Sequence, residues 1–363
     1  MSLTAKQPRI AIATGEDYAL PGKDCWKDDR DLRKALLSIM GQEEGVDIIN
    51  WRDENQPWER YDAIFVSSTW DIPHHPQAFF QWVDRCTTNR QRLINDSQLI
   101  LDNVIKSCYL QFLMDRFQHE PLPNCSIIPC AFFGEKADPI YNVRAVNGKT
   151  LDQLIDDLTI VNPLWQAKGI VIKPVISADA LSTYLYNTSG SEFPNIANPA
   201  LLLDQPAAQQ TFDRLTRQPQ LRGIILQPYI DGVEQGEYSL VFFNDTFSHA
   251  IRKPGGFVQN SSKDRVPVTD PAELTDMIAF GKKALEHMAD RYGSHALTRT
   301  RIDLFKDGDH YYLCELECTE PNTNLQRFDE PAQQEILKRY ALAIYDQALV
   351  LMQQGQWLSK PAV

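Results

Sequence analysis

The stretches Arg301-Ile302-Asp303-Leu304-Phe305 and Tyr311-Tyr312-Leu313-Cys314-Glu315-Leu316-Glu317 decide how the rest of the chain is interpreted. Both runs have the composition of β-strands, and the Asp307-Gly308 pair between them is typical of a hairpin turn. Charged residues interrupt runs that are otherwise apolar. Because residues two apart share one face of a strand, Arg301 is expected beside Asp303, and Glu315 beside Glu317.

The length of the loop decides whether these carboxylates meet. A two-residue Asp307-Gly308 turn would put Asp303 and Glu315 on opposite faces, whereas a five-residue loop from Asp307 to Tyr311 would set them directly opposite each other. Three carboxylates that converge in a half-buried sheet repel one another unless a cation binds them. Asp303, Glu315 and Glu317 are therefore candidate ligands of Mg²⁺, which prefers oxygen ligands and usually accompanies a nucleotide phosphate. The alternative is a surface hairpin whose charges pair with nearby Lys and Arg.

The amino-acid composition of the chain limits the classes of molecule that it is expected to bind. The 363 residues include 36 basic and 48 acidic side chains, a net charge of −12. No overall basic field exists to attract a nucleic acid or an anionic membrane. The apolar runs are too short to span a membrane, and residues 1–6 lack the apolar core of a signal peptide. Seven scattered cysteines without a Cys-x-x-Cys pair favour reduced thiols, so we expect a cytoplasmic protein without zinc.

The first hundred residues alternate between strand and helix patterns. Strands are expected at 9–13, 46–49, 63–66 and 93–95, and helices at 32–39 and 78–86. This alternation predicts a small parallel sheet, in which ligands lie beyond the carboxyl ends of the strands. Candidate substrate residues in those places are Asp17 after the first strand and Trp70 and Asp71 after the third. A Gly-x-Gly-x-x-Gly dinucleotide fingerprint is absent.

Two lysines stand out in the middle of the chain. Lys106 belongs to a helix pattern at about 103–117, and Lys173 ends a buried strand at 169–174. Further strands are expected at 224–230, 237–243 and 246–252. A helix capped by Asp270 follows, and a long helix at about 331–354 closes the chain.

In this order the motifs resemble the ATP-grasp superfamily of carboxylate–amine ligases, from about residue 60 to 350. The most similar branch contains the prokaryotic glutathione synthetase-like proteins and the ligase of D-cycloserine biosynthesis. The matching motifs are Ser68-Thr69-Trp70-Asp71, Val171-Ile172-Lys173-Pro174, Ile176-Ser177-Ala178, Gln227-Pro228-Tyr229, Gly236-Glu237-Tyr238-Ser239-Leu240-Val241-Phe242, Phe247-Ser248-His249-Ala250-Ile251-Arg252-Lys253, Arg301-Ile302-Asp303 and Glu315-Leu316-Glu317 with Glu320-Pro321.

The resemblance implies an α/β and α+β architecture, the ATP-grasp fold. An N-terminal parallel-sheet α/β domain (1–101) would precede two α+β subdomains that clasp ATP. These are a central subdomain (102–226) and a C-terminal subdomain (227–363) that carries the magnesium-binding hairpin.

The resemblance also assigns roles to the matching residues. Lys106 and Lys173 would hold the ATP phosphates, and Ser177 would begin the loop that closes over them. Adenine would contact the backbone of Gln227, Tyr229 and Ile230, and Glu234 or Glu237 would accept from the ribose. Arg301, Arg252 and Lys253 would face the transferred phosphoryl group and the substrate carboxylate. Many relatives carry Asn where this chain has Glu317, and the added carboxylate would be offset by a second Mg²⁺.

The implied reaction has two steps. A substrate carboxylate attacks ATP to give an acyl phosphate and ADP, and an amine then displaces phosphate to form an amide. The substrate would be an amino acid or small peptide, joined to a second molecule or closed into a ring. Two alternatives use the same site: an ATP-dependent phosphotransferase, and a nucleotide-binding module without turnover. Relatives in the superfamily are often dimers, so a homodimer is compatible with the resemblance.

Overall fold

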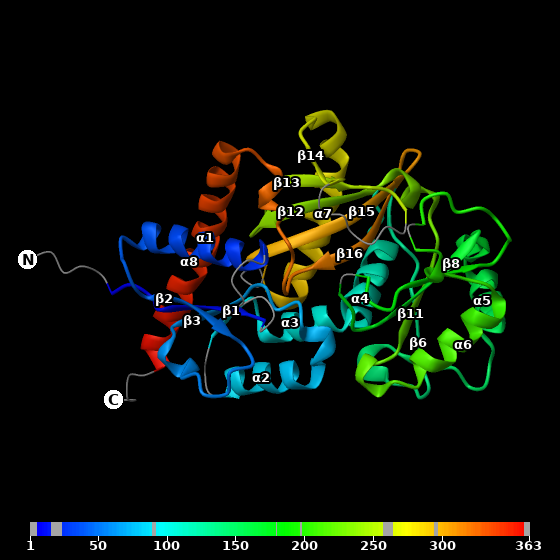
Figure 1. Cartoon of the computed structure of the whole chain (residues 1–363), viewed down its shortest axis with the longest axis horizontal. Helices are drawn as coiled ribbons and strands as arrows, with labels where there is room; N and C mark the ends of the chain where they lie inside the picture. The colour runs from blue at the N-terminus through cyan, green and yellow to red at the C-terminus, as the bar shows by residue number, and fades with distance from the viewer. Residues whose placement is uncertain are drawn as a thin grey trace, which may run out of the picture.

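Three β-sheets and eight α-helices organise the described part of the chain (Figure 1). The computed structural model describes residues 6–15, 24–88, 92–178, 180–196, 198–256, 264–293 and 297–358. Among these residues, no helix is both long and apolar enough to cross a membrane.

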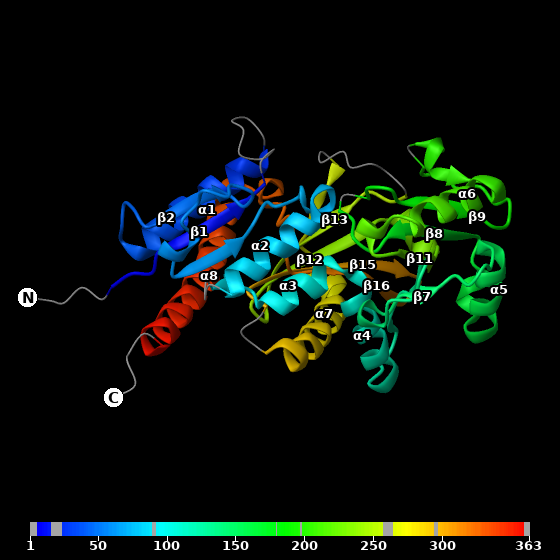
Figure 2. The same cartoon turned by 90° about the horizontal axis from the view of Figure 1, so that it is seen from below.

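The first sheet is parallel, as the alternating pattern predicted. Its order is β2-β1-β3-β4, and it contains β1 (Ile10–Thr14), β2 (Val46–Asn50), β3 (Ala63–Val66) and β4 (Leu93–Ile94). The helices of this part are α1 (Asp24–Met40) and α2 (Pro76–Thr88). The last helix, α8 (Glu330–Leu358), returns to this sheet, and its Ile336, Tyr340 and Ile344 share a buried core with Ile10 and Leu36. The two ends of the chain therefore pack together (Figures 1 and 2).

The central sheet has the order β10-β9-β8-β11-β6-β7. Its apolar core is shared with two helices, α5 (Leu151–Val161) and α6 (Gln205–Thr216). α5 begins with a complete capping box between Thr150 and Gln153. The strands are β6 (Ala131–Gly134), β7 (Arg144–Ala145), β8 (Gly169–Pro174), β9 (Tyr184–Asn187), β10 (Leu202–Leu203) and β11 (Ile224–Pro228).

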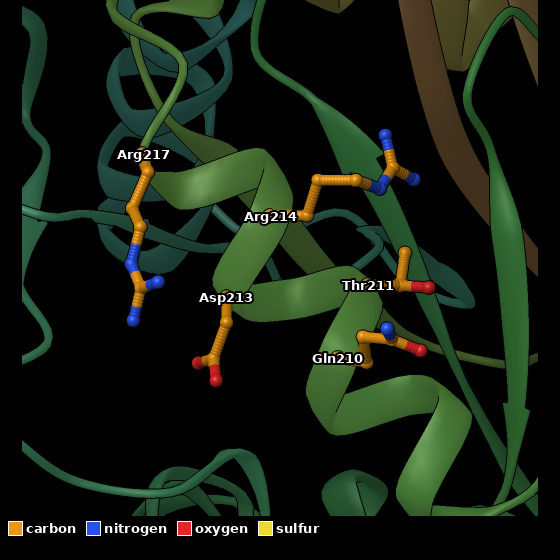
Figure 3. A pocket seen from close by; sticks show the side chains of 5 residues that line it. All are labelled: Gln210, Thr211, Asp213, Arg214 and Arg217. Atoms are coloured by element: carbon orange, nitrogen blue, oxygen red, sulfur yellow. The ribbon is translucent and has the colours of Figure 1, made fainter.

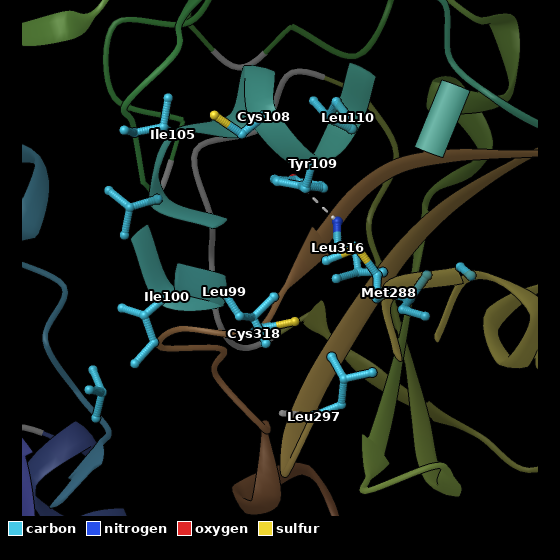
Figure 4. Close-up of a cluster of buried hydrophobic side chains, with 14 of the residues drawn as sticks. Leu99, Ile100, Ile105, Cys108, Tyr109, Leu110, Met288, Leu297, Leu316 and Cys318 are labelled. Atoms are coloured by element: carbon cyan, nitrogen blue, oxygen red, sulfur yellow. Dashed lines mark hydrogen bonds between the residues drawn. The ribbon is translucent and has the colours of Figure 1, made fainter. Parts of the chain in front are cut away.

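The third sheet has the order β14-β13-β12-β15-β16-β5. Its strands are β5 (Cys125–Ile127), β12 (Glu237–Phe243), β13 (Thr246–Lys253), β14 (Val266–Val268), β15 (Arg299–Asp307) and β16 (His310–Glu317). One core joins it to α3 (Ser97–Val104), α4 (Lys106–His119) and α7 (Pro271–Tyr292). Figure 4 shows part of this core, where the Tyr109 hydroxyl accepts a hydrogen bond from the Leu316 amide at 3.4 Å.

The predicted helix at about 103–117 is two helices. α3 ends at Val104, and Ile105 has a non-helical backbone (φ −92°, ψ 83°) before α4 begins at Lys106. The break places Lys106 at the start of a helix. The predicted domain boundary between residues 101 and 102 falls inside α3. In addition, α4 and β5, which belong to the predicted central subdomain, pack with the third sheet. The division into three units stays a prediction.

The β15–β16 hairpin reaches its register by a route that the sequence did not indicate. Only Gly308 and Asp309 separate the strands, because Asp307 pairs with His310. The register then shifts between Asp303 and Leu304: Leu304 pairs with Leu313, whereas Asp303 pairs with Glu315. A β-bulge at Cys314 therefore supplies the change of register that a longer loop would have supplied, and it sets Asp303 directly opposite Glu315.

Candidate nucleotide and substrate cavity

A cavity of about 300 Å³ lies between the central sheet and the third sheet. Its wall includes residues of β8 and β11 on one side and of β12, β13, β15 and β16 on the other. Most of the predicted site residues line it: Trp70, Lys106, Lys173, Ser177, Gln227, Tyr229, Ile230, Glu237, Lys253, Arg301, Asp303, Glu315 and Glu317. Three others, Asp71, Glu234 and Arg252, are not part of its wall, and Asp17 lies outside the described residues.

The two predicted phosphate lysines differ in how they are held. Lys106 is buried, and its ammonium contacts the Glu315 carboxylate at 3.2 Å and donates to the Ser177 carbonyl. Burial alone would lower the pKa of Lys106, but Glu315 and Glu317 outweigh it and raise that pKa. Lys173 is half-buried, and its ammonium forms no close ion pair or hydrogen bond with the described part of the chain, although its charge lowers the pKa of Glu315. Lys173 is therefore a cation available to an anionic ligand.

Asp303 lies at the centre of a buried ionic network. Its carboxylate accepts from Arg301 Nε at 3.0 Å and from Ser239 Oγ at 2.6 Å, and it lies 3.5 Å from Lys253 Nζ. Burial alone would raise the pKa of Asp303, but Arg301 and Lys253 hold that pKa well below its usual range. Lys253 also pairs with Glu237. Asp303 is thus ionised and neutralised by two cations.

The carboxylates of β16 and of the segment after it have fewer close cations than Asp303. Glu317 accepts from the Thr319 amide at 2.9 Å and the Glu320 amide at 3.2 Å. Burial and the neighbouring Glu315 carboxylate raise the pKa of Glu317. Lys106 and Lys173 offset burial at Glu315, so that its pKa is lowered. Each added negative charge in this region is therefore costly without a further cation.

The cavity wall carries equal numbers of acidic and basic side chains. They are the carboxylates of Glu237, Asp303, Glu315, Glu317 and Glu320 and the cations of Lys106, Lys173, Lys253, Arg265 and Arg301. A triphosphate brings several negative charges to this balanced wall, and a divalent cation would offset them. The oxygen donors suit Mg²⁺ chemically. However, no three acidic, His or Cys side chains among the described residues are gathered closely enough to hold an ion as they stand.

The part of the cavity beside β11 is lined by apolar and aromatic side chains, among them Tyr229, Ile230 and Phe305. Tyr229 and Ile230 are buried, and the Tyr229 ring packs edge-on against Phe193 at 5.1 Å between centroids. The Tyr229 amide is already donated to the Gly169 carbonyl at 2.8 Å, and the Gln227 side chain donates to Cys130 Sγ at 3.1 Å. The Tyr229 amide is therefore engaged within the protein, whereas the side-chain bond of Gln227 does not involve the backbone that was predicted to contact adenine.

The two predicted ribose acceptors are both engaged. Glu234 accepts from the Tyr229 hydroxyl at 2.5 Å and from the Asn195 amide at 2.9 Å. Glu237 pairs with Lys253, and burial raises its pKa. Only Glu237 lines the cavity, so it is better placed than Glu234 to meet a ligand.

Arg252 was predicted beside the transferred phosphoryl group, but the structure does not bring it to the cavity. It is exposed and pairs with Tyr238 across the β12–β13 ladder, whereas the next residue, Lys253, lines the cavity. Neighbouring residues of a strand point to opposite faces, which separates the two side chains. We therefore place Lys253 and Arg301, and not Arg252, at this wall.

Trp70 and Asp71 connect the N-terminal sheet to the cavity. Trp70 lines the cavity and donates from its indole nitrogen to the Glu320 carbonyl at 2.8 Å. Asp71 is buried behind it and accepts from the Trp51 indole nitrogen at 2.9 Å. Trp70 is therefore the predicted substrate residue that a ligand in the cavity can touch.

Sequence reasoning assigned no role to several lining residues, among them Arg265, Cys314, Glu320 and Asn322. Glu320 stood in a matching motif with Pro321, which was a signal that could have identified it. Cys314 is the bulge residue, and no pattern in the sequence marks a bulge. Arg265 reaches the cavity only through the packing of residues just before β14, where its guanidinium meets Asn324.

A second cavity lies over α6, lined by Gln210, Thr211, Asp213, Arg214 and Arg217 (Figure 3). All five residues come from one helix and the residue that follows it, and their side chains spread apart in the figure. None of the predicted site residues is among them, so this surface hollow is not the candidate site.

Comparisons with known proteins agree with the geometry. A family model described as the N-terminal domain of D-cycloserine synthetase DcsG matches residues 10–95. The cycloserine biosynthesis protein DcsG of Streptomyces lavendulae is 25% identical over 287 residues, which cover 77% of this chain and 83% of that protein. The chain is homologous to this protein.

Solved structures show the fold. The crystal structure of D-cycloserine synthetase DcsG superposes with a TM-score of 0.69 at 22% identity, over 93% of this chain and 99% of that chain. D-alanine–D-alanine ligase from Bacillus anthracis, complexed with ATP, gives 0.58 at 10% identity, over 96% and 99%. The ATP-grasp ligase PsnB, complexed with a minimal precursor, Mg and ADP, gives 0.51 at 11% identity, over 94% and 98%. The chain has the ATP-grasp fold, as predicted.

Proposed function

We propose that this chain is an ATP-dependent carboxylate–amine ligase that forms an amide or peptide bond through an acyl phosphate. The observation that carries the proposal is the cavity between the two sheets, where Lys106 and Lys173 meet the carboxylates of β15 and β16. Homology to DcsG and the likeness to ATP-grasp ligases support this chemistry and do not favour a phosphotransferase or a module without turnover.

Each cation of the wall has a distinct task in this proposal. Lys173 binds phosphate oxygens directly, because its ammonium lines the cavity and is not held in a close ion pair among the described residues, although its charge lowers the pKa of Glu315. Lys106 exchanges part of its contact with Glu315 for a phosphate oxygen when the nucleotide arrives. Arg301 and Lys253 face the acceptor side, where their donors neutralise charge that develops on the transferred phosphoryl group.

The nucleotide base occupies the part of the cavity beside β11, between Tyr229 and Ile230, which follow β11, and Phe305 of β15. Glu237 accepts from the ribose. Ser177, whose carbonyl receives the Lys106 ammonium, ties the segment after β8 to the phosphate site. The nucleotide thus contacts residues of both sheets.

Glu315, Glu317 and Asp303 would hold the magnesium, as one or two ions. When bound, the metal neutralises phosphate oxygens and fixes their orientation. The chain's own residues orient the two substrates and exclude water. The substrate carboxylate oxygen forms a bond to the γ-phosphorus while the bond to the ADP oxygen breaks. The amine nitrogen then bonds to the acyl carbon, phosphate leaves, and the amine loses a proton.

The substrates are small molecules, an amino acid or a small peptide. The net charge of −12 provides no attraction for nucleic acid or an anionic membrane. A homodimer and a place in the cytoplasm remain expectations of the same proposal.

The deciding experiment measures phosphate release from Mg²⁺-ATP in the presence of amino acids, singly and in pairs. Release that requires a pair of compounds, or one compound able to cyclise, is the expected result. Glu315→Gln removes the carboxylate that contacts Lys106 and should abolish release. Glu335→Gln on the exposed part of α8 is the matched control. Transfer of phosphate to a stable product without amide formation would instead identify a phosphotransferase.

A further inference from the structure

One strand edge beside the cavity is covered by side chains instead of a neighbouring strand. β5 pairs with β16 only from Tyr311 to Leu313, whereas β16 continues to Glu317. Leu316 and Cys318, which lie past the end of this pairing, are fully buried. Buried backbone N–H and C=O groups are costly without a hydrogen-bond partner, so this part of the edge needs another source of partners.

Asn103, near the end of α3, supplies these partners with one side-chain amide. Its Nδ2 donates to the Leu316 carbonyl at 2.7 Å, and its Oδ1 accepts from the Cys318 amide at 2.7 Å. Oδ1 also accepts from the amide and the hydroxyl of Thr319, each at 3.1 Å. The Leu316 amide donates to the Tyr109 hydroxyl of α4 (Figure 4). The Asn103 amide therefore takes the place that a peptide group of a neighbouring strand would take.

The bonds of Asn103 hold the two peptide groups that flank Glu317. The Leu316 carbonyl belongs to the peptide group before Glu317, and the Cys318 amide belongs to the peptide group after it. Because peptide groups are planar, the orientations of these two planes fix the backbone dihedrals of Glu317 and the direction of its Cα–Cβ bond. Asn103 is 5% exposed and is not part of the cavity wall, yet it sets the direction of a carboxylate that is.

The carboxylate of Glu317 is tied to the same turn. Its Oε1 accepts from the Thr319 amide at 2.9 Å and from the Glu320 amide at 3.2 Å. The Thr319 amide is shared with Asn103 Oδ1. Asn103 therefore contacts both the backbone that carries Glu317 and one of the amides that receive its carboxylate.

A second contact of the same helical segment lies close by. Three residues after Asn103, the ammonium of Lys106 contacts the Glu315 carboxylate at 3.2 Å. α3 and α4 are thus fastened to β16 at two points, one at Glu317 and one at Glu315. Because Lys106 is a proposed phosphate ligand, nucleotide affinity measured without metal shows whether a substitution at Asn103 has displaced it.

We propose that Asn103 is a positioning residue that directs the Glu317 carboxylate toward the metal of the nucleotide site. It touches neither nucleotide nor metal and acts through Glu317. A hydrogen-bond partner that orients a metal ligand typically contributes about 10- to 100-fold to metal affinity. This inference rests on the proposed function, in which Glu317 holds magnesium, and it names the residue on which that role depends.

The test measures how much a divalent cation tightens ADP binding, so it does not depend on turnover. Calorimetric titration of the full-length protein with ADP, in Mg²⁺ and in EDTA, gives two dissociation constants. Their ratio is the magnesium gain. In a second series Mn²⁺ replaces Mg²⁺, and electron paramagnetic resonance of the free Mn²⁺ reports metal binding directly. The variants are Asn103→Leu, Glu317→Gln and the two combined.

Asn103→Leu should reduce the magnesium gain by roughly tenfold, and Glu317→Gln should reduce it by a similar factor. The combined variant should lose no more than about twofold beyond Glu317→Gln alone, because a residue that acts through Glu317 then has no ligand left to orient. Mn²⁺ binding should follow the same order. The affinity for ADP in EDTA should change less than about threefold in Asn103→Leu, which would show that Lys106 is still in place.

Two control substitutions separate positioning from general stability. Thr319→Val removes a hydroxyl that donates to the same Asn103 oxygen and leaves both peptide groups of Glu317 held. Met277→Ala opens a cavity in the core that α7 shares with the third sheet, and it should lower the melting temperature. Both should keep the wild-type magnesium gain.

A smaller substitution covers the case in which Asn103→Leu does not fold. Asn103→Ser is neutral, and its single hydroxyl can satisfy at most one of the two peptide groups that flank Glu317. It should reduce the magnesium gain by at least about threefold, as expected for the loss of one hydrogen bond.

Three results would overturn the inference and leave the ligase function standing. They are a wild-type magnesium gain in Asn103→Leu or Asn103→Ser, losses that add in full in the combined variant, and an equal loss in Met277→Ala. A wild-type protein that binds ADP no more tightly with Mg²⁺, or a Glu317→Gln variant with an unchanged gain, would instead contradict the magnesium site of the proposed function, and the inference would fall with it.

Discussion

Asp303 of β15 lies directly opposite Glu315 of β16, although the turn that joins these strands contains only two residues. The bulge at Cys314 changes the register between Asp303 and Leu304, and the two carboxylates therefore share one face. The same face carries Arg301 opposite Glu317. The acidic wall of the cavity thus depends on one extra residue in β16.

Replacing Asp303 should destabilise the fold as well as impair the reaction. Asp303→Asn keeps an acceptor for Ser239 but removes the carboxylate that pairs with the buried Arg301, and it leaves Lys253 with Glu237 as its remaining partner. Breaking a buried pair by removing one partner costs about 3–5 kcal/mol. Denaturant unfolding measures this loss. Asp245→Asn in the exposed β12–β13 turn is the control and should be neutral; equal stability of the two variants would show that the network contributes nothing.

Substitutions of Lys106 and Lys173 should have different effects on the stability of the fold and on nucleotide binding. Lys173→Gln should weaken ATP binding by roughly 10- to 100-fold, as expected for a lost charged contact, and leave the melting temperature nearly unchanged. Lys106→Gln should weaken ATP binding and also destabilise, because it removes the ion pair to Glu315 and the bond to the Ser177 carbonyl. Calorimetric titration and thermal unfolding measure the two effects, with exposed Lys338→Gln as the control. An unaltered ATP affinity in Lys173→Gln would remove Lys173 from the site.

A buried acid in the N-terminal part should make stability depend on pH. Asp29 is 1% exposed and accepts from Ser67 and Ser68, and burial raises its pKa from 3.8 to about 6. The folded state therefore binds the proton more tightly than the unfolded chain. This contribution to stability is present below about pH 4 and is lost as the pH rises to about 6.

Asp29→Asn removes this titration. The stability of the variant relative to the wild type should rise between about pH 4 and pH 6, by on the order of 3 kcal/mol in total, and then level off. Urea unfolding at several pH values measures the difference. A difference that is flat across this range would contradict the raised pKa.

A glycine beside the nucleotide cavity should control its closure. A Cβ at Gly255 would lie 2.1 Å from the Glu234 carbonyl oxygen, so Gly255→Ala should push residues 254–256 away from residues 234–236. We expect weaker ATP binding, by about tenfold, measured by titration. Gly190→Ala, where a Cβ would meet nothing within 4 Å, would strain its own turn because Gly190 has φ 70°, but it should leave ATP binding unchanged. Wild-type affinity in Gly255→Ala would show that this close contact does not shape the cavity.

The N-terminal sheet illustrates how far local pattern determines structure. All four of its strands and both of its helices were predicted, because buried parallel strands and amphipathic helices leave clear periodicities. The N-cap of α7 was also predicted from the sequence: Asp270 accepts from the Ala272 amide at 2.9 Å, and Pro271 begins the helix. The ordered motifs predicted the ATP-grasp fold, which the comparisons confirm.

Other features were decided only by tertiary structure. The break at Ile105, the bulge at Cys314 and the position of β5 in the third sheet arise from packing between segments far apart in the chain. The same packing turned Arg252 away from the cavity and brought Arg265 and Glu320 to it.

The sequence by itself determined many of the strands and helices, the fold and most of the charged residues that line the cavity, because periodicity and local propensity act within a few residues. The tertiary structure decided which charges meet. It pairs Lys106 with Glu315, commits Arg301 to Asp303 and leaves Glu320 with an open oxygen. Electrostatic partners depend on register and on distances between distant segments, and a one-residue shift in β16 would have placed its acidic side chains on the other face.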